Sequence, residues 1–174
     1  MYFGAIKKTD VADGPGVRVT LFVSGCSIHC PGCHNPAAQD FKYGQEFSDN
    51  TLSDILTALQ PDYIEGFTLC GGEPFAVENQ QCCYNILKKI RETYPGKSIW
   101  AYSGYYLETI PHTAFTNEIL KLIDVLVEGP FILDLRDITS YNVWRGSTNQ
   151  RILDIPETLK AGRKIYLKNI SNNC

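Results

Sequence analysis

Strand-like and helix-like segments alternate along the chain, and this alternation constrains its fold more than any other feature. Runs rich in β-branched, aromatic and other apolar residues predict strands at 16–23, 66–70, 98–102 and 124–128. Apolar residues at helical spacing predict helices at 51–59, 77–94 and 115–123. Strands separated by helices form βαβ crossovers, which align the strands in parallel and place the helices against the sheet. We therefore expect an α/β fold with a parallel sheet, and a last strand at 164–167.

The composition suits a single globular domain spanning 1–174, with 44% hydrophobic and 20% charged residues. The 16 Lys and Arg against 19 Asp and Glu give a formal charge of −3, which argues against binding to nucleic acid or to an anionic membrane. No apolar run approaches the ~18 residues needed to cross a bilayer, and the N-terminus lacks a secretory signal pattern. We expect a cytoplasmic protein whose cysteines stay reduced.

The most specific motif follows the first predicted strand, and ligands of parallel sheets bind at the carboxyl ends of strands. Cys26, Cys30 and Cys33 have the spacing C-x3-C-x2-C. Structural zinc takes four protein ligands; His29 or His34 could supply the fourth, but the usual second cysteine pair is missing. A [4Fe–4S] cluster held by three cysteines would leave one iron open for another ligand. The spacing favours the cluster over structural zinc and over a metal-free cysteine loop.

Four other cysteines lack a compact spacing, so no second cluster is predicted. Cys70 and Cys83 fall at apolar positions and are expected in the core, whereas Cys82 and Cys174 are candidates for exposed thiols.

A Gly-Gly-Glu-Pro turn follows the second predicted strand, at 71–74. Its two glycines would let backbone groups approach a ligand closely, and its glutamate adds an acceptor. The simpler alternative is a plain strand-to-helix turn.

The cysteine motif after the first strand resembles the cluster motif of the radical S-adenosylmethionine (radical SAM) superfamily. Within that superfamily, the chain is similar to the activators of anaerobic (class III) ribonucleotide reductase. The narrower similarity rests on motifs between about residue 10 and about residue 152, at 13–18, 21–26, 30–36, 69–74, 102–105, 127–131 and 144–151. Many superfamily members have an aromatic residue before the third cysteine, where this chain has Gly32, as the reductase activators allow. The segment 153–174 matches no motif.

The resemblance implies roles for particular residues. The three cysteines would hold three irons, and the methionine amino and carboxylate groups of S-adenosylmethionine would chelate the fourth. The same amino group would also bind to the turn made of Gly71, Gly72, Glu73 and Pro74. Ser103 and Glu128 would line the pocket. The alternative for Ser103 is a role in a turn, and the alternative for Glu128 is a surface carboxylate. Arg145 would pair with the methionine carboxylate or face the protein partner.

The implied reaction is reductive cleavage of S-adenosylmethionine to methionine and a 5′-deoxyadenosyl radical. This radical would remove hydrogen from a glycine of the large reductase subunit, and a low-potential donor such as flavodoxin would supply the electron. A full eight-unit barrel needs ~250 residues, so we expect a partial, open (βα)n barrel of the radical SAM type. Two alternatives remain. One is an activator of another glycyl-radical enzyme such as pyruvate formate-lyase, although such activators are usually longer, and the other is a non-enzymatic zinc-binding adaptor.

Overall fold

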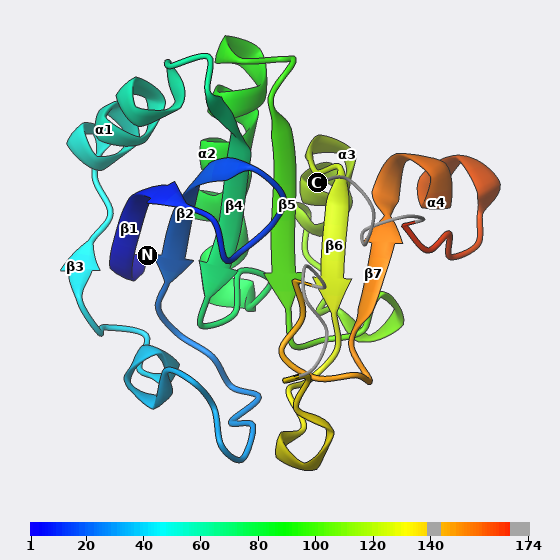
Figure 1. The fold of residues 1–174 in the computed structure, drawn as a ribbon. Helices are drawn as coiled ribbons and strands as arrows, with labels where there is room; N and C mark the ends of the chain where they lie inside the picture. The colour runs from blue at the N-terminus through cyan, green and yellow to red at the C-terminus, as the bar shows by residue number, and fades with distance from the viewer. Residues whose placement is uncertain (139–143, 168–174) are drawn as a thin grey trace.

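A computed structural model describes residues 1–138 and 144–167 of the chain. It contains a seven-stranded sheet in the order β3-β1-β2-β4-β5-β6-β7 (Figure 1). Four neighbouring strands run parallel: β2 (Val17–Val23), β4 (Ile64–Gly71), β5 (Ser98–Ser103) and β6 (Val125–Glu128). These correspond to the four apolar runs followed by turn signals, so the prediction of a parallel sheet is confirmed for the centre of the sheet.

Antiparallel strands flank the parallel centre. β1 (Tyr2–Asp10) pairs with β2 and with the short β3 (Gln45–Glu46), and β7 (Arg151–Asp154) pairs with β6. The sequence pattern misses β1 because exposed charged residues interrupt its apolar positions. The strand expected at 164–167 is wrong as a strand: Tyr166 forms only an isolated bridge with Leu153 of β7.

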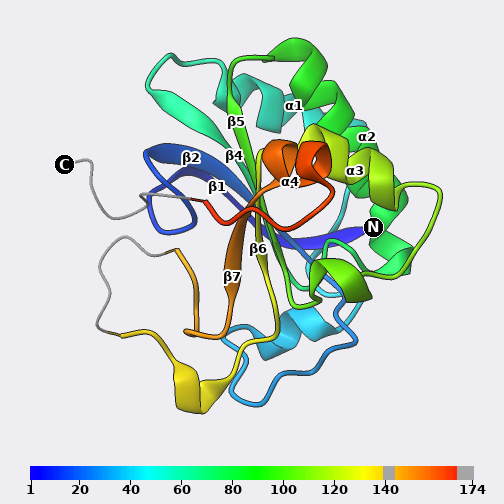
Figure 2. The same ribbon diagram turned by 90° about the vertical axis from the view of Figure 1, so that its right-hand side faces the viewer.

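The described residues form four α-helices, which lie on one side of the sheet (Figure 2): α1 (Asp49–Leu59), α2 (Val77–Thr93), α3 (Thr116–Leu122) and α4 (Ile155–Ala161). The first three were expected from helical spacing. Helix α4 was not; it begins where the Asp154 side chain accepts a hydrogen bond from the Glu157 amide. Short 3-10 turns lie at η1 (Pro36–Gln39), η2 (Leu107–Thr109) and η3 (Leu133–Leu135).

Alternate residues of the parallel strands point to opposite faces of the sheet. Toward the helices, side chains such as Leu21, Leu69 and Ile99 are fully buried in the main hydrophobic core. Among the residues that the structure describes, no helix lies over the opposite face, which is turned to the viewer in Figure 1. On it, Trp100 of β5 belongs to a second, smaller apolar cluster. The helix-free face is therefore where a ligand can reach the sheet.

The sheet stays open, because no pairing joins its edge strands β3 and β7 within the described part of the chain. The prediction of an open α/β sheet is therefore confirmed. Within 1–138 and 144–167, no helix combines the length and the apolar character needed to cross a membrane.

Candidate active site

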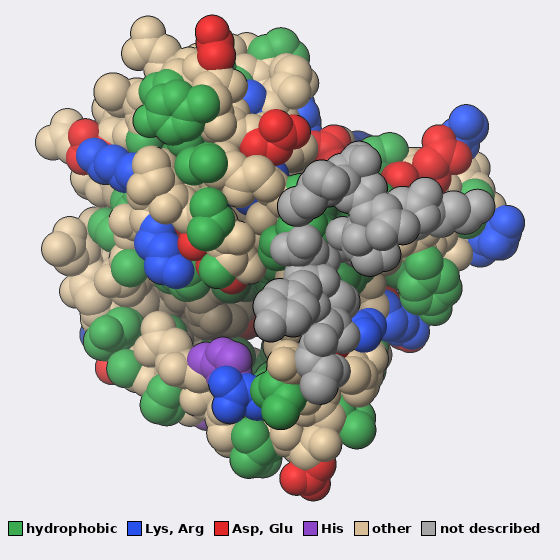
Figure 3. All heavy atoms as spheres, viewed as in Figure 1, with side chains coloured by type: hydrophobic (Ala, Val, Ile, Leu, Met, Phe, Trp, Pro, Cys, Tyr) green, Lys and Arg blue, Asp and Glu red, His purple; other side chains and the backbone are tan. Residues whose placement is uncertain are grey.

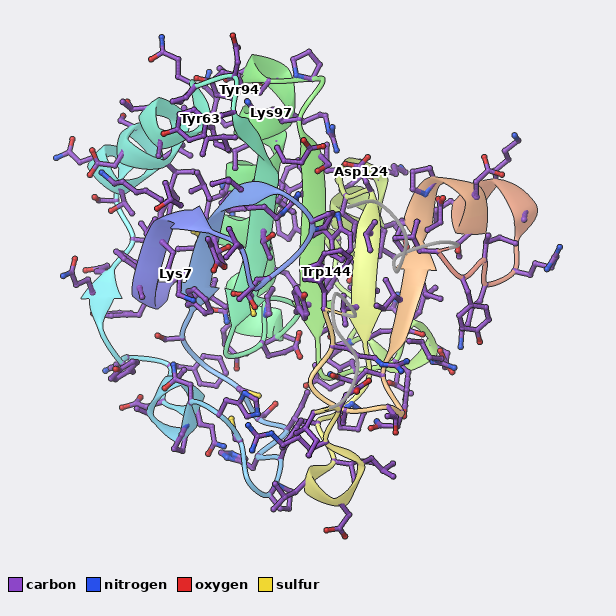
Figure 4. All side chains as sticks on the ribbon, viewed as in Figure 1. Lys7, Tyr63, Tyr94, Lys97, Asp124 and Trp144 are labelled. Atoms are coloured by element: carbon purple, nitrogen blue, oxygen red, sulfur yellow. The ribbon has the colours of Figure 1, made fainter. Side chains whose placement is uncertain are left out.

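A cavity of about 630 Å³ lies at the carboxyl ends of the parallel strands. Its walls come mainly from residues 11–13, 26–39, 70–73, 102–104, 129–131 and 144–150. Figure 3 shows a hollow on the helix-free face, between the lower end of the sheet and the loop that carries the cysteines. Trp144 lies over this face (Figure 4), and its carbonyl oxygen accepts a hydrogen bond from the Tyr102 hydroxyl at 2.9 Å. Ligands of parallel sheets bind at this end.

Cys26, Cys30 and Cys33 all line this cavity, and each is half-buried and free of disulfide bonds. The root of their loop is tied to η1: the Gly25 amide donates to the Ala38 carbonyl at 2.8 Å, and the Cys26 amide to the Gln39 carbonyl at 3.1 Å. The loop therefore returns to its starting point and holds the three thiols at one end of the sheet.

The described residues contain no group of three Cys, His, Asp or Glu side chains gathered closely enough for a single metal ion. Structural zinc needs four such ligands around one position. An iron–sulfur cluster takes its thiolates on different irons, so its ligands surround a larger body. The three cysteines that face this cavity carry the thiol groups that usually hold iron–sulfur clusters.

Gly71 and Gly72 lie where the end of β4 meets the root of the cysteine loop. A Cβ atom on Gly71 would lie 2.5 Å from the Val23 backbone, and one on Gly72 would lie 2.6 Å from the Gly25 carbonyl oxygen. These glycines line the cavity, and the space that a Cβ atom would take is occupied by the backbone of residues 23–25. They let β4 and the cysteine loop pack side by side.

Glu73 joins the ends of β4 and β5. Its carboxylate is fully buried and accepts hydrogen bonds from the Ser103 hydroxyl at 2.9 Å, the Gly104 amide at 2.7 Å and the Phe75 amide at 2.9 Å. Burial raises the pKa of Glu73 to about 7, although these hydrogen bonds oppose the shift. Glu73 therefore holds the cavity wall in place with its carboxylate.

The other predicted site residues separate into two groups. Ser103 and Arg145 line the cavity, and Arg145 is paired through its Nε with Asp137 at 3.2 Å. Pro74 and Glu128 are not among the residues of the cavity wall. Their contact with a cofactor stays a prediction: Pro74 belongs to the turn that follows Glu73, and the Glu128 carboxylate pairs with Arg151.

Glu128 is buried in an ion-pair cluster beside the cavity. Its carboxylate lies 2.7 Å from Nε of Arg151 and accepts a short hydrogen bond from the Leu107 amide. Arg151 and Lys164 also pair with Glu108, at 3.2 and 2.5 Å. Burial raises the pKa of Glu128, and Arg151 counteracts this rise. The cluster ties the segment after β5 to β6 and β7.

Sequence analysis assigned neither Cys70 nor Asp13 to a site, and both line the cavity. Cys70 was expected in the core, but it lines the cavity and is half-buried, whereas Cys83 is buried as expected. Cys174 lies outside the described residues. Asp13 also faces the cavity; burial and the nearby Asp10 raise its pKa to about 7. The sequence could have pointed to Asp13, because it lies in a turn just before a predicted strand.

Comparison with known proteins identifies the family. A family model described as "4Fe-4S single cluster domain" matches residues 12–153. A protein of Enterobacteria phage T4 is 36% identical over 152 residues, which cover 87% of this chain and 93% of that protein. A protein of Escherichia coli (strain K12) is 39% identical over 143 residues, covering 81% and 90%. Both are named "Anaerobic ribonucleoside-triphosphate reductase-activating protein". The chain belongs to this family.

The buried side-chain amide of Asn79 also holds the wall of the candidate active site in place. From the start of α2, it donates to the carbonyl oxygens of Ser24 at 3.0 Å and Glu73 at 2.9 Å. Asn79 thus joins the root of the cysteine loop to the turn after β4. Sequence analysis missed it, although position 79 precedes Cys83 by one helical turn and so continues the apolar face of α2.

Replacing Glu73 with glutamine is expected to flatten the pH dependence of stability. The unfolded carboxyl group loses its proton near 4.5 and the folded one near 7, so the folded state binds more protons in this window. The contribution of Glu73 to stability therefore falls by about 3 kcal/mol as the pH rises from 4.5 to 7. Below pH 4.5 this contribution is fully present and does not change with pH. Glutamine does not titrate, so the part of the fall that Glu73 contributes should disappear, while the part that comes from Asp13 should remain.

The measurement is the denaturant midpoint at several pH values under anaerobic conditions. Glu78→Gln, at an exposed position in the first turn of α2, is the matched control and should keep the native slope. An unchanged slope in Glu73→Gln would contradict the assignment of the buried carboxylate as the titrating group.

Proposed function

We propose that this protein is the enzyme that activates an anaerobic ribonucleotide reductase by generating a glycyl radical on it. The observation that carries the proposal is the convergence of three unpaired cysteine thiols on one cavity at the carboxyl ends of parallel strands. The names of its relatives and the 4Fe–4S family model support the same conclusion.

Cys26, Cys30 and Cys33 are the proposed ligands of a [4Fe–4S] cluster with one open iron. Thiolates are the usual ligands of such clusters, and all three side chains reach the same cavity. When bound, the cluster would supply the electron that cleaves S-adenosylmethionine, and the resulting 5′-deoxyadenosyl radical would remove hydrogen from a glycine of the reductase. The role of the protein is then to orient S-adenosylmethionine and to keep water away.

The cavity wall offers groups suited to S-adenosylmethionine. We assign the methionine amino group to the backbone of Gly71 and Gly72, with Glu73 acting as a positioning residue through Ser103 and Gly104. Arg145 supplies a cation suited to the methionine carboxylate. Apolar side chains complete the wall and exclude water: Phe22, Ile28, Phe131 and Trp144.

The open sheet supports a protein substrate, because a polypeptide segment can approach the helix-free face without crossing a closed barrel. We assign residues 1–174 to one radical SAM domain with a partial, open barrel. We also propose that it works in the cytoplasm, where thiols stay reduced, and that a low-potential donor such as flavodoxin delivers the electron.

The deciding experiment combines the protein, S-adenosylmethionine, a reductant and the large reductase subunit without oxygen. We expect a glycyl-radical doublet in the electron paramagnetic resonance spectrum, and none when S-adenosylmethionine is omitted. A doublet formed on pyruvate formate-lyase but not on the reductase would redirect the assignment to another glycyl-radical enzyme. One zinc per chain and no iron after anaerobic purification would support the adaptor instead.

A further inference from the structure

Four apolar side chains are exposed in the segment after β6. Ile132 is 39% exposed, Leu133 52%, Leu135 42% and Ile138 79%. Single exposed apolar residues are common, but several within one short segment mark a surface that another molecule covers. We call these four residues the rim patch.

The rim patch is held firmly in place. The buried Ser147 hydroxyl accepts a hydrogen bond from the Ile132 amide at 3.2 Å, and the Asn149 side-chain amide donates to the Pro130 carbonyl at 2.8 Å. The Thr148 amide donates to the Leu135 carbonyl at 2.8 Å. A segment with this many backbone contacts loses little conformational entropy when a partner binds, so its apolar side chains are pre-organised.

The rim patch borders the candidate active site. Phe131, directly before it, forms part of the cavity wall and packs edge-on against His34 of the cysteine loop, with ring centroids 4.9 Å apart. The Leu133 side chain lies beside Gly32, where a Cβ atom would come within 3.1 Å of it. The patch thus continues outward from the cavity and from the cysteine loop.

We propose that the rim patch docks the reductase segment that carries the target glycine; the proposal rests on the function proposed above. A glycine within a folded subunit can enter the cavity only as part of a polypeptide segment, so the residues flanking it must lie on the cavity rim. Asp134 and Arg136, exposed between the apolar residues, have opposite charges. The surface is therefore nearly neutral and apolar, and it fits a segment with apolar side chains next to the glycine.

The test compares Leu135→Asp and Ile138→Asp with Leu159→Asp. Leu159 is 48% exposed on α4, so it provides the same change of side chain away from the rim. Binding of the reductase subunit to each holoprotein is measured by anaerobic titration. Both rim variants should bind at least 10-fold more weakly, which is about 1.4 kcal/mol, because the new carboxylate would be buried against an apolar surface without a partner. Leu159→Asp should bind like the native protein.

A second readout separates docking from chemistry. Cleavage of S-adenosylmethionine by reductant in the absence of the reductase should stay within about twofold of native in the rim variants, as should their iron content, because exposed substitutions rarely disturb folding. Native affinity in both rim variants would overturn the proposal, and so would a parallel loss of reductase-independent cleavage. Failure of the proposed function would be distinct: the native protein would bind the reductase and form no glycyl radical.

Discussion

Replacing Cys30 with serine is expected to remove the iron–sulfur cluster and abolish glycyl-radical formation. Cys30 lies between the other two proposed ligands and faces the same cavity. Serine keeps the size of the side chain but replaces a soft sulfur ligand with an oxygen that binds iron–sulfur clusters poorly. The same result is expected for Cys26→Ser and Cys33→Ser. Iron and sulfide analysis after anaerobic reconstitution, followed by paramagnetic resonance with the reductase, measures both effects.

Cys82→Ser is the matched control, because Cys82 lies on α2 and is absent from the cavity wall. This variant should retain four irons per chain and the native radical yield. Cys70→Ser is informative in another way, since Cys70 lines the cavity but stands apart from the motif; it should keep the cluster. If any single variant of the motif keeps native iron content and radical yield, the three-cysteine site is wrong.

Replacing Arg18 with methionine is expected to destabilise the fold by about 3 to 5 kcal/mol. Arg18 is fully buried beneath the helix-free face, where it joins three strands. Its guanidinium donates to the Thr68 hydroxyl at 2.7 Å, the Phe67 carbonyl at 2.8 Å and the Ser98 hydroxyl at 2.9 Å. Methionine fills similar volume but donates nothing, so buried acceptors on β4 and β5 lose their partner.

The electrostatic setting of Arg18 strengthens this expectation. Hydroxyl and carbonyl oxygens contact the guanidinium directly, the Trp100 ring lies 5.7 Å away, and the negative charges of Glu65, Asp124 and Asp10 also favour its charged form. Burial lowers its pKa to about 10, which still leaves it charged at neutral pH. Lysine lacks the planar fork that reaches several acceptors, so Arg18→Lys should recover only part of the stability.

Chemical denaturation of the anaerobic protein measures these differences. Arg163→Met removes an exposed arginine and should change stability by less than about 0.5 kcal/mol. A shift for Arg18→Met no larger than that of Arg163→Met would contradict the structural role assigned to the buried guanidinium.

The central strands and the first three helices could be predicted from local sequence. A buried parallel strand appears as a continuous apolar run, and α1 and α2 show apolar residues at helical spacing. The flanking antiparallel strands could not, because they are half-exposed or short: β1 includes Lys7 and Lys8, and β7 has four residues. Residues 164–167 looked like a strand, yet they contribute only a bridge to β7.

The cysteine motif and its position after β2 were determined by the sequence alone, because the ligand spacing of a cluster is a local property of one loop. The directions of side chains were decided only by the tertiary structure. Glu73 turns toward Ser103 and Gly104, and Glu128 turns away from the cavity toward Arg151, because each buried carboxylate must find donors, and those donors come from distant parts of the chain. Such partners are set by how strands pack side by side, which no local pattern specifies.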